Sequence, residues 1–356
     1  MKKYRYLLSF SITIATILAL QSENLLSFAT VIYAFGILPI LELVLPPDVT
    51  NWSDEEEVIL EKDVLFDVFV VMAAVCQLVL FGYFLTNISA LSPTDITFWG
   101  RALSFGVHTG VMGINVGHEL GHRLNRAMQR LAMALLATSL YAHFFIEHNF
   151  GHHKNVSTPD DPSSARLNEP VYFFWIRAVS LGLVSAFNIE KERLKRKKQP
   201  VFSFKNLFLT LMLLQLGMIV AVFVLFGSIG LIGFLVSATT GFLLLETVNY
   251  IEHYGLMRKK VSERRYEDVN VTHSWNSDHI IGRSVLFELS RHSDHHENPH
   301  RKYQILKHYD QSPQLPTGYP GMMLLSLIPP LWFYVMNEKI NQLNDNRQRR
   351  VAAPAE

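Results

Sequence analysis

The chain has 356 residues, of which 49% are hydrophobic and only 18% are charged, and its formal net charge is +1. The charged fraction is low for a soluble domain, and the absence of a basic face interleaved with aromatic residues argues against nucleic-acid binding. A single cysteine, Cys76, excludes an internal disulfide and any metal site built on Cys-x-x-Cys pairs.

Six apolar stretches approach the roughly 20 residues that a helix needs to cross the hydrocarbon core. They are residues 6–20, 25–45, 64–85, 96–116, 204–226 and 228–250. The first is short, but "ALQSENLL" is a poor signal-peptide cleavage site and a second apolar stretch follows almost at once. We therefore predict an all-α integral membrane protein with six transmembrane helices, which form one domain over residues 1–356.

A seventh apolar segment, 321–336, is interrupted by Pro329 and Pro330. These prolines favour an interfacial or docked segment over a membrane span.

The positive charges predict the orientation of the spans. The connections at 21–24, 86–95 and 227 contain no Lys or Arg, whereas the segments 117–205 and 251–356 are rich in both. Because positively charged loops stay in the cytoplasm, both termini are expected there, in a cell inner membrane. The histidine clusters at 118–153 and 253–296 then share the cytoplasmic side, as one metal site requires.

The histidines are expected to lie on helices. No break separates the fourth span from "NVGHELGHR", so that helix should continue and carry His118 and His122. Residues 129–153 form a second helix-length segment, which ends at the turn signals of "STPDDPSS". Residues 284–296 have helical spacing and stop before Pro299.

Three histidine pairs are spaced i,i+4, which places two rings on one helix face where both can reach one ion. The pairs are His118 with His122, His148 with His152, and His292 with His296. His153 and His295 add further ligand directions, and His253 in "VNYIEHYG" is a ninth candidate. Imidazole nitrogen suits iron, copper and zinc, and so many donors exceed one four-coordinate zinc and favour two metals.

Ligating histidines usually donate their second N–H to a carboxylate or amide. The candidates for such supporting contacts are Glu119, Glu147, Asp160, Asp161, Asn249, Glu252 and Asp294. His273 and His279 are left open as extra ligands or hydrogen-bonding residues. The isolated histidines, which are His108, His143, His300 and His308, are assigned no role.

These residues resemble the integral-membrane histidine-box enzymes and, more closely, the bacterial membrane alkane monooxygenases (alkane 1-hydroxylases). The resemblance rests on "NVGHELGHR", "EHNFGHHKNVSTPDDPSSAR", "NYIEHYGL", "HSWNSDH", "RHSDHHENPHRKYQIL" and "LPTGYPGMMLLSLIPPLWF". It runs from about residue 114 to the C-terminal apolar segment. Arg123 and Ser290 stand where lysine and glutamine are common in the family, and neither is a predicted ligand.

The resemblance implies a non-haem di-iron site in a cytoplasmic helical cap above six membrane helices. Such an enzyme uses O2 and two electrons to hydroxylate the terminal carbon of an n-alkane. Carried over by position, the iron ligands are His118, His122, His148, His152, His153, His253, His292, His295 and His296. The implied electron donor is a rubredoxin, which a flavin-dependent reductase reduces. The rubredoxin must be a separate protein, because this chain has one cysteine and a fused rubredoxin would need two cysteine pairs.

Several alternatives are kept. A related histidine-box oxygenase would act on xylene-like aromatics or on the ω-position of acyl chains. A desaturase is disfavoured by "NYIEHYGL", which we do not associate with that branch. A metal carrier or transporter would place ionisable residues near the bilayer midplane. The histidine clusters lie beyond the ends of the predicted spans, and Arg101 and His108 are the only conspicuous ionisable residues within a span.

Overall fold

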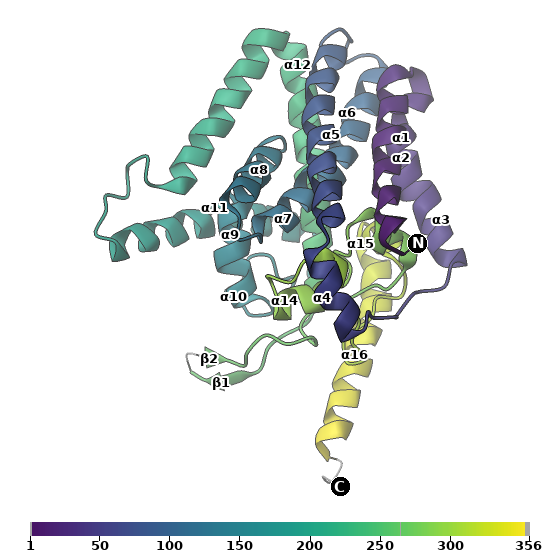
Figure 1. Ribbon diagram of the computed structural model, residues 1–356, viewed down its shortest axis with the longest axis vertical. Coiled ribbons are helices and arrows are strands. Elements are labelled where there is room, and N and C mark those ends of the chain that lie inside the picture. The colour runs from purple at the N-terminus through teal and green to yellow at the C-terminus, as the bar shows by residue number, and fades with distance from the viewer. Residues whose placement is uncertain (1, 264, 353–356) are drawn as a thin grey trace.

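The computed structural model describes residues 2–263 and 265–352, and the side chains up to residue 345. These residues are mostly helical (Figure 1). The α-helices of the N-terminal half are α1 (Phe10–Gln21), α2 (Ala29–Ile32), α3 (Leu38–Val44), α4 (Asp54–Lys62), α5 (Val64–Ile88), α6 (Ile96–His108), α7 (Val116–Gly121), α8 (Arg126–Ala137), α9 (Phe144–Glu147) and α10 (His153–Asn155). Those that follow are α11 (Val171–Arg196), α12 (Leu207–His253), α13 (Ile280–Val285), α14 (His292–Glu297), α15 (Tyr319–Ser326) and α16 (Pro329–Ala352).

Shorter elements complete the chain. A small antiparallel hairpin pairs β1 (Lys260–Ser262) with β2 (Arg265–Tyr266). The 3-10 segments are η1 (Lys2–Ser9), η2 (Asn24–Phe28) and η6 (Tyr303–Ile305), and the π-helical segments are η3 (Tyr33–Ile37), η4 (Thr109–Asn115) and η5 (His148–His152). Two of the π segments, η4 and η5, lead directly into histidine-bearing helices.

Four helical stretches among the described residues are long and apolar enough to cross a membrane. They are Asn24–Val44, Val64–Ile88, Val171–Arg196 and Leu207–His253. The first, second and fourth overlap the predicted spans 25–45, 64–85, 204–226 and 228–250. The segments 6–20 and 96–116 are also helical but are not among these four. The chain is a membrane protein.

Helix α12 contains two of the predicted spans. Gly227 interrupts it with φ 68° and ψ −171°, a backbone conformation that is essentially restricted to glycine. In Figure 1 the two halves of α12 meet at the top of the view, so they form a hairpin. The predicted connection at residue 227 therefore lies at the break.

The sequence interpretation missed α11. It assigned residues 117–205 to a cytoplasmic connection because of their many basic residues, yet Val171–Arg196 is one continuous helix. Its first turns are apolar, and its basic residues lie mainly in the last turn. Figure 1 shows α11 lying across the direction of α5 rather than parallel to it.

Two other predicted helices are broken. Residues 129–153 fold as α8 and then α9, η5 and α10, with Leu140 in the left-handed region (φ 54°) between them. Residues 284–296 fold as the end of α13 and the start of α14, with Phe287 (φ 50°) and Glu288 (φ 59°) between them. Helical spacing alone does not reveal such breaks, because neither contains a glycine or proline.

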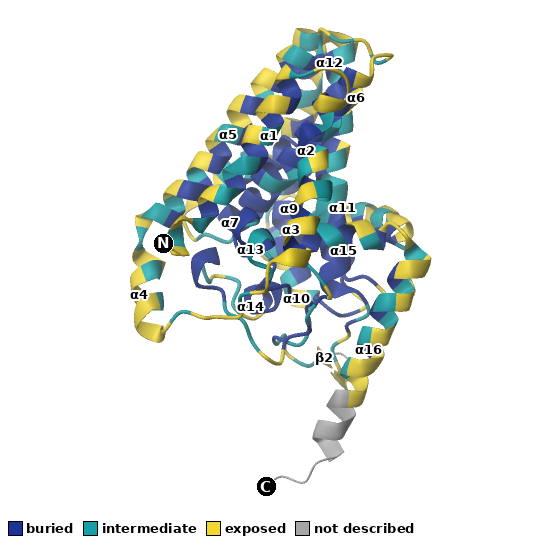
Figure 2. Ribbon diagram, turned by 90° about the vertical axis from the view of Figure 1, so that its right-hand side faces the viewer, coloured by how far each residue is buried: buried dark blue, intermediate teal, exposed yellow. Residues whose placement is uncertain are grey.

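The apolar segment 321–336 is docked, as predicted. It forms α15 and the start of α16, and Met322 and Trp332 are fully buried against Tyr250 and Tyr254 of the α12 end. Figure 2 shows the outer helices exposed along much of their length and the buried residues gathered below them, around α9, α14 and α15. That buried region holds the histidines.

Candidate metal centre and apolar cavity

Nine histidines converge from four parts of the chain. The end of α7, the η5–α10 segment, the last residue of α12 and helix α14 bring their side chains together beneath the long helices. The first group contains five of them: His118, His122, His148, His153 and His295. The second group contains four: His152, His253, His292 and His296. In each group the candidate ligand atoms all lie within 4.8 Å of one another.

The histidine nitrogens face one another. In the first group Nε2 of His148 lies 3.1 Å from Nε2 of His122 and 3.0 Å from Nε2 of His153. In the second group Nε2 of His292 lies 3.2 Å from Nε2 of His253 and 2.9 Å from Nε2 of His296. Two imidazole ligands at about 2.1 Å from an ion and at right angles to each other are about 3.0 Å apart, so these separations fit a shared metal.

Hydrogen bonding within the chain does not account for this arrangement. A neutral imidazole has one N–H, so several Nε2 atoms around one point cannot all be satisfied by each other. Nε2 of His152 is buried and has no hydrogen-bond partner. Unpaired buried nitrogens are costly, and a bound cation would satisfy them together.

Burial lowers the pKa of every histidine of the two groups except His152. Burial, together with the neighbouring His152, lowers the pKa of His118 to about 3, so its ring is neutral and able to coordinate at physiological pH. The pKa of His152 behaves differently. Burial alone would lower it, but the adjacent Asp161 carboxylate raises it above the usual value.

The π-helical segment η5 changes which histidines act together. On an α-helix His148 and His152 would share a face, which was the prediction. A π-helix has i→i+5 hydrogen bonds and a wider turn than an α-helix. In this structure His148 joins His153, whereas His152 belongs to the second group. The pairs His118–His122 and His292–His296 do fall in one group each, as predicted.

Of the seven supporting residues that the sequence suggested, two contact a histidine of the groups. Oδ2 of Asp161 lies 2.9 Å from Nδ1 of His152, behind the ring as expected for a ligand's support. Oε2 of Glu252 lies 3.1 Å from Nε2 of His292, on the side of the ring that faces the group, and its other oxygen accepts from the Tyr319 hydroxyl.

The other five candidates are engaged elsewhere. Glu119 pairs with Arg123, Asp294 pairs with Arg301, and the Asn249 amide donates to Glu246. Asp160 is exposed. Glu147 lies near the Ser185 hydroxyl, and burial beside Asp161 raises its pKa to about 8.

Neither histidine left open by the sequence belongs to a group. His273 contacts Glu267 and the backbone of Asn270. His279 lies next to the Ser277 hydroxyl, just before α13.

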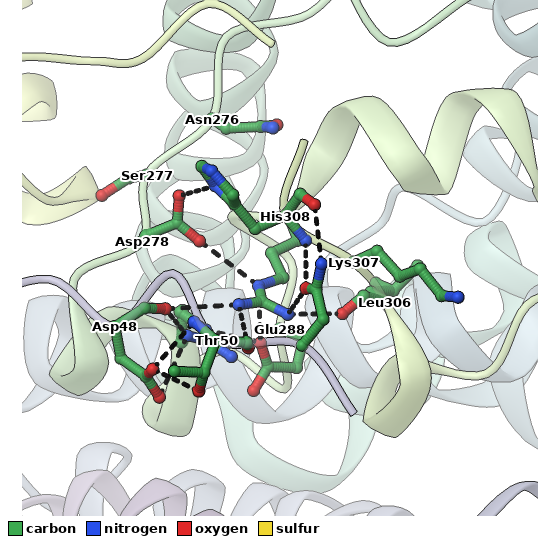
Figure 3. Close-up of polar contacts among 12 residues, drawn as sticks. Asp48, Thr50, Asn276, Ser277, Asp278, Glu288, Leu306, Lys307 and His308 are labelled. Atoms are coloured by element: carbon green, nitrogen blue, oxygen red, sulfur yellow. Dashed lines mark hydrogen bonds and ion pairs between the residues drawn. The ribbon is translucent and has the colours of Figure 1, made fainter. Parts of the chain in front are cut away.

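Sequence reasoning missed a buried ionic network behind α14. The Arg291 guanidinium donates to the backbone carbonyls of Asp48, Thr50 and Leu306 and pairs with Asp278. Figure 3 shows these partners, together with Glu288 and His308, gathered at one place beneath the helices. The network ties the 46–52 loop to the residue before His292. The only sequence signal is an arginine adjacent to a histidine cluster.

An apolar cavity leads to the histidines. Its walls come from α1, η3, α3, the α6–η4 region, α12, α13 and α15, and they include Leu38, Val111, Leu244, Val285 and Met323. His118 and His148 of the first group and His292 of the second also line it. The cavity therefore brings both groups to one apolar chamber.

The sequence of this chain is similar to those of known proteins. Residues 94–325 match the family model described as "Fatty acid desaturase". The chain is 40% identical to alkane 1-monooxygenase 1 of Pseudomonas aeruginosa, over 95% of this chain and 91% of that protein. It is 38% identical to an alkane 1-monooxygenase of Ectopseudomonas oleovorans, over 86% of this chain and 76% of that protein.

The chain belongs to the alkane 1-monooxygenases, within the fatty acid desaturase family. It is also 29% identical to the xylene/toluene monooxygenase hydroxylase component of Pseudomonas putida, over 80% of this chain and 74% of that protein. Membership of the alkane 1-monooxygenase family places this chain among oxidoreductases. The resemblance inferred from the histidine motifs is confirmed.

Proposed function

We propose that this protein hydroxylates the terminal carbon of n-alkanes with O2, at a non-haem di-iron centre held by the two histidine groups. The observation that carries the proposal is the apolar cavity that ends at His118, His148 and His292. An alkane offers no polar handle, so an apolar chamber that meets two metal-binding groups suits such a substrate. About 0.8 kcal/mol per buried CH2 favours its transfer from water.

Nine histidines would hold the two irons, five in the first group and four in the second. When bound, iron supplies the oxygen activation that no side chain provides. Asp161 holds the His152 ring through Nδ1 and so directs Nε2 to the second group. Glu252, fixed by the Tyr319 hydroxyl, adds a carboxylate at the edge of that group.

The cavity walls orient the substrate. Phe144 and Leu289 line the chamber beside the histidines, and Ile12 and Val107 lie among the membrane helices. A hydrocarbon held between such walls presents its chain end to the histidine groups, because proximity and orientation decide which carbon reacts. The same walls exclude water from the reacting carbon.

We also propose the topology predicted from the sequence. Six spans of one membrane-embedded domain would cross the inner membrane, and both termini and the histidine groups would lie in the cytoplasm. Helix α11 would then lie at the interface, with Phe173 and Ile176 exposed to lipid. Its crosswise direction in Figure 1 and its basic last turn support this placement.

The electron donor is proposed to be a separate rubredoxin, which would dock beside α11. A groove there has more basic than acidic residues in its lining: Lys154, Arg166, Arg177, Arg193, Arg196 and Lys197 against Asp160, Asp161, Glu190 and Glu192. Asp161, the partner of His152, lies in the same groove. An acidic donor seated in it would complement the charge and lie one side chain away from the second group.

The first test is the product. The purified protein, reconstituted with a rubredoxin and its reductase, is given a mixture of n-alkanes, xylene and a fatty acyl ester under 18O2. A labelled 1-alkanol is expected. If iron is bound and a known enzyme works alongside, absence of any product would contradict the proposal and favour the metal-carrier alternative.

A second candidate is benzylic hydroxylation of xylene-like aromatics, which the 29% identity to the xylene/toluene monooxygenase component supports. In the same experiment it would give a labelled benzylic alcohol. An ω-hydroxylated ester or an alkene would indicate the acyl-chain oxygenase or the desaturase instead.

A further inference from the structure

Glu42 is a buried acid on α3, within one of the stretches that are long and apolar enough to cross a membrane. Its neighbours Leu43 and Val44 are each 75% exposed, whereas Glu42 is 1% exposed and points inward. Oε1 accepts a hydrogen bond of 2.9 Å from the backbone N–H of Gly282, and Oε2 has no hydrogen-bond partner. A buried carboxylate with an unpaired oxygen costs free energy, so Glu42 is not explained as a favourable packing residue.

Two glycines on separate elements make room for this carboxylate. Gly282 lies in the first turn of α13, and a methyl group there would lie 2.6 Å from Oε1 of Glu42. Gly318 precedes α15, and a methyl group there would overlap both carboxylate oxygens. The backbones before α15 and within α13 therefore approach Glu42 as closely as only glycine permits, and α3 packs against both helices.

The three helices that meet at Glu42 form one wall of the cavity. Leu38 of α3, Val285 of α13 and Met323 of α15 all line it. The first residue of α15, Tyr319, also lines the cavity and donates to Glu252, which contacts His292. One end of this wall is thus held at Glu42, and the other end reaches the second histidine group.

We propose that Glu42 is a positioning residue that fixes the spacing of α3, α13 and α15 and so sets the width of the cavity. The width decides how well a linear hydrocarbon is preferred over a branched one, because shape is the only basis for recognising an alkane. This inference rests on the proposed function in one respect, that the cavity is the hydrocarbon site.

The test compares Glu42→Ala, Glu42→Gln, Gly318→Ala and the double variant Glu42→Ala/Gly318→Ala with a matched control, Glu190→Ala. Glu190 is also buried (2% exposed) and accepts a backbone N–H, that of Leu207 at 2.9 Å. It lines the groove beside α11 and not the cavity, so its hydrocarbon binding and linear-to-branched ratio serve as the control and its kcat does not. The measurements are the equilibrium binding of radiolabelled n-decane and 2-methylnonane to the purified full-length protein, the KM and kcat for both, and the melting temperature.

Glu42→Ala is expected to weaken n-decane binding and raise its KM about fourfold, the loss of roughly one CH2 contact. Binding of 2-methylnonane should be weakened less, so the linear-to-branched ratio falls. Glu42→Gln should lie closer to the wild type, since its amide oxygen still accepts from Gly282. Gly318→Ala should be less harmful in the Glu42→Ala background than alone, because the clashing carboxylate is gone.

A lower melting temperature with an unchanged ratio in both Glu42 variants would overturn the proposal, and so would an equal ratio change in Glu190→Ala. Because binding is measured without turnover, a wild type that binds n-decane but forms no alcohol would contradict the proposed function and still test Glu42. A wild type that binds neither hydrocarbon would overturn the inference.

Discussion

Replacing Arg291 by methionine should release iron from the second histidine group. Arg291 is 2% exposed, and its guanidinium donates to the carbonyl oxygens of Leu306 at 2.7 Å, Thr50 at 3.0 Å and Asp48 at 3.2 Å. Its Nε lies 3.3 Å from Oδ1 of Asp278 (Figure 3). Methionine fills a similar volume but takes this donor away from three backbone carbonyls, of which that of Leu306 is buried, and from Oδ1 of Asn51, and it leaves the buried Asp278 carboxylate without this ion pair.

The expected loss is about 3–5 kcal/mol, the usual cost of removing one partner from a buried ionic contact. That energy corresponds to a factor of about 100 to several thousand in the local opening of α14. Because His292 follows Arg291 directly, each opening would detach a ligand of the second group. Arg291→Lys should show a smaller effect, since lysine keeps the charge but lacks the planar fork of donors.

The assay is the rate at which a ferrous chelator removes iron from the detergent-purified protein, together with the melting temperature. Arg265→Met is the control, because its ion pair with Asp268 is exposed and surface pairs contribute little. Arg291→Met should release iron at least 100-fold faster than this control. Equal release rates and melting temperatures in the two variants would refute the role assigned to the network.

Three further predictions concern the histidine groups and the topology. His292→Ala should lose iron from the second group and all hydroxylation activity, whereas His279→Ala, outside both groups, should keep two irons per chain. Elemental analysis measures the iron and product assays measure the activity. A fully active His292→Ala variant would refute the assignment of His292 as a ligand. Asp161→Asn should weaken iron binding by about 10- to 100-fold, the usual effect of replacing a residue that holds a metal ligand in place. An unchanged affinity in a chelator competition would show that Asp161 is not needed to hold His152. Tags after residue 356 and within 190–200 should both be protected in intact cells, and labelling of the second tag alone would show that α11 crosses the membrane.

The spacing of the histidines in the sequence predicted only part of how they are grouped in the structure. An α-helical repeat correctly places His118 with His122 and His292 with His296. It fails at His148, because η5 is π-helical and the extra residue per turn moves His152 to the other group. A π turn depends on tertiary packing rather than on a residue type that marks it in the sequence.

Proximity in sequence also did not separate the carboxylates that contact the histidine groups from those that do not. Asp160 and Asp161 are adjacent, yet only Asp161 turns inward to His152. Asp294 lies between two predicted ligands and instead binds Arg301. Conversely, no sequence motif marks Glu42 or Arg291. Each bonds to a segment more than 200 residues away in the chain, and that contact exists only in the folded protein.

The two histidine groups are interlaced along the chain. The segment His148–His153 supplies both groups, and so does α14, which gives His295 to the first and His292 and His296 to the second. An ion bound to either group therefore orders two segments, His148–His153 and α14, that also carry ligands of the other group. By linkage, each ion should strengthen the binding of the other by the same factor. Iron loading should then be cooperative, with chains that hold one iron rare at partial occupancy.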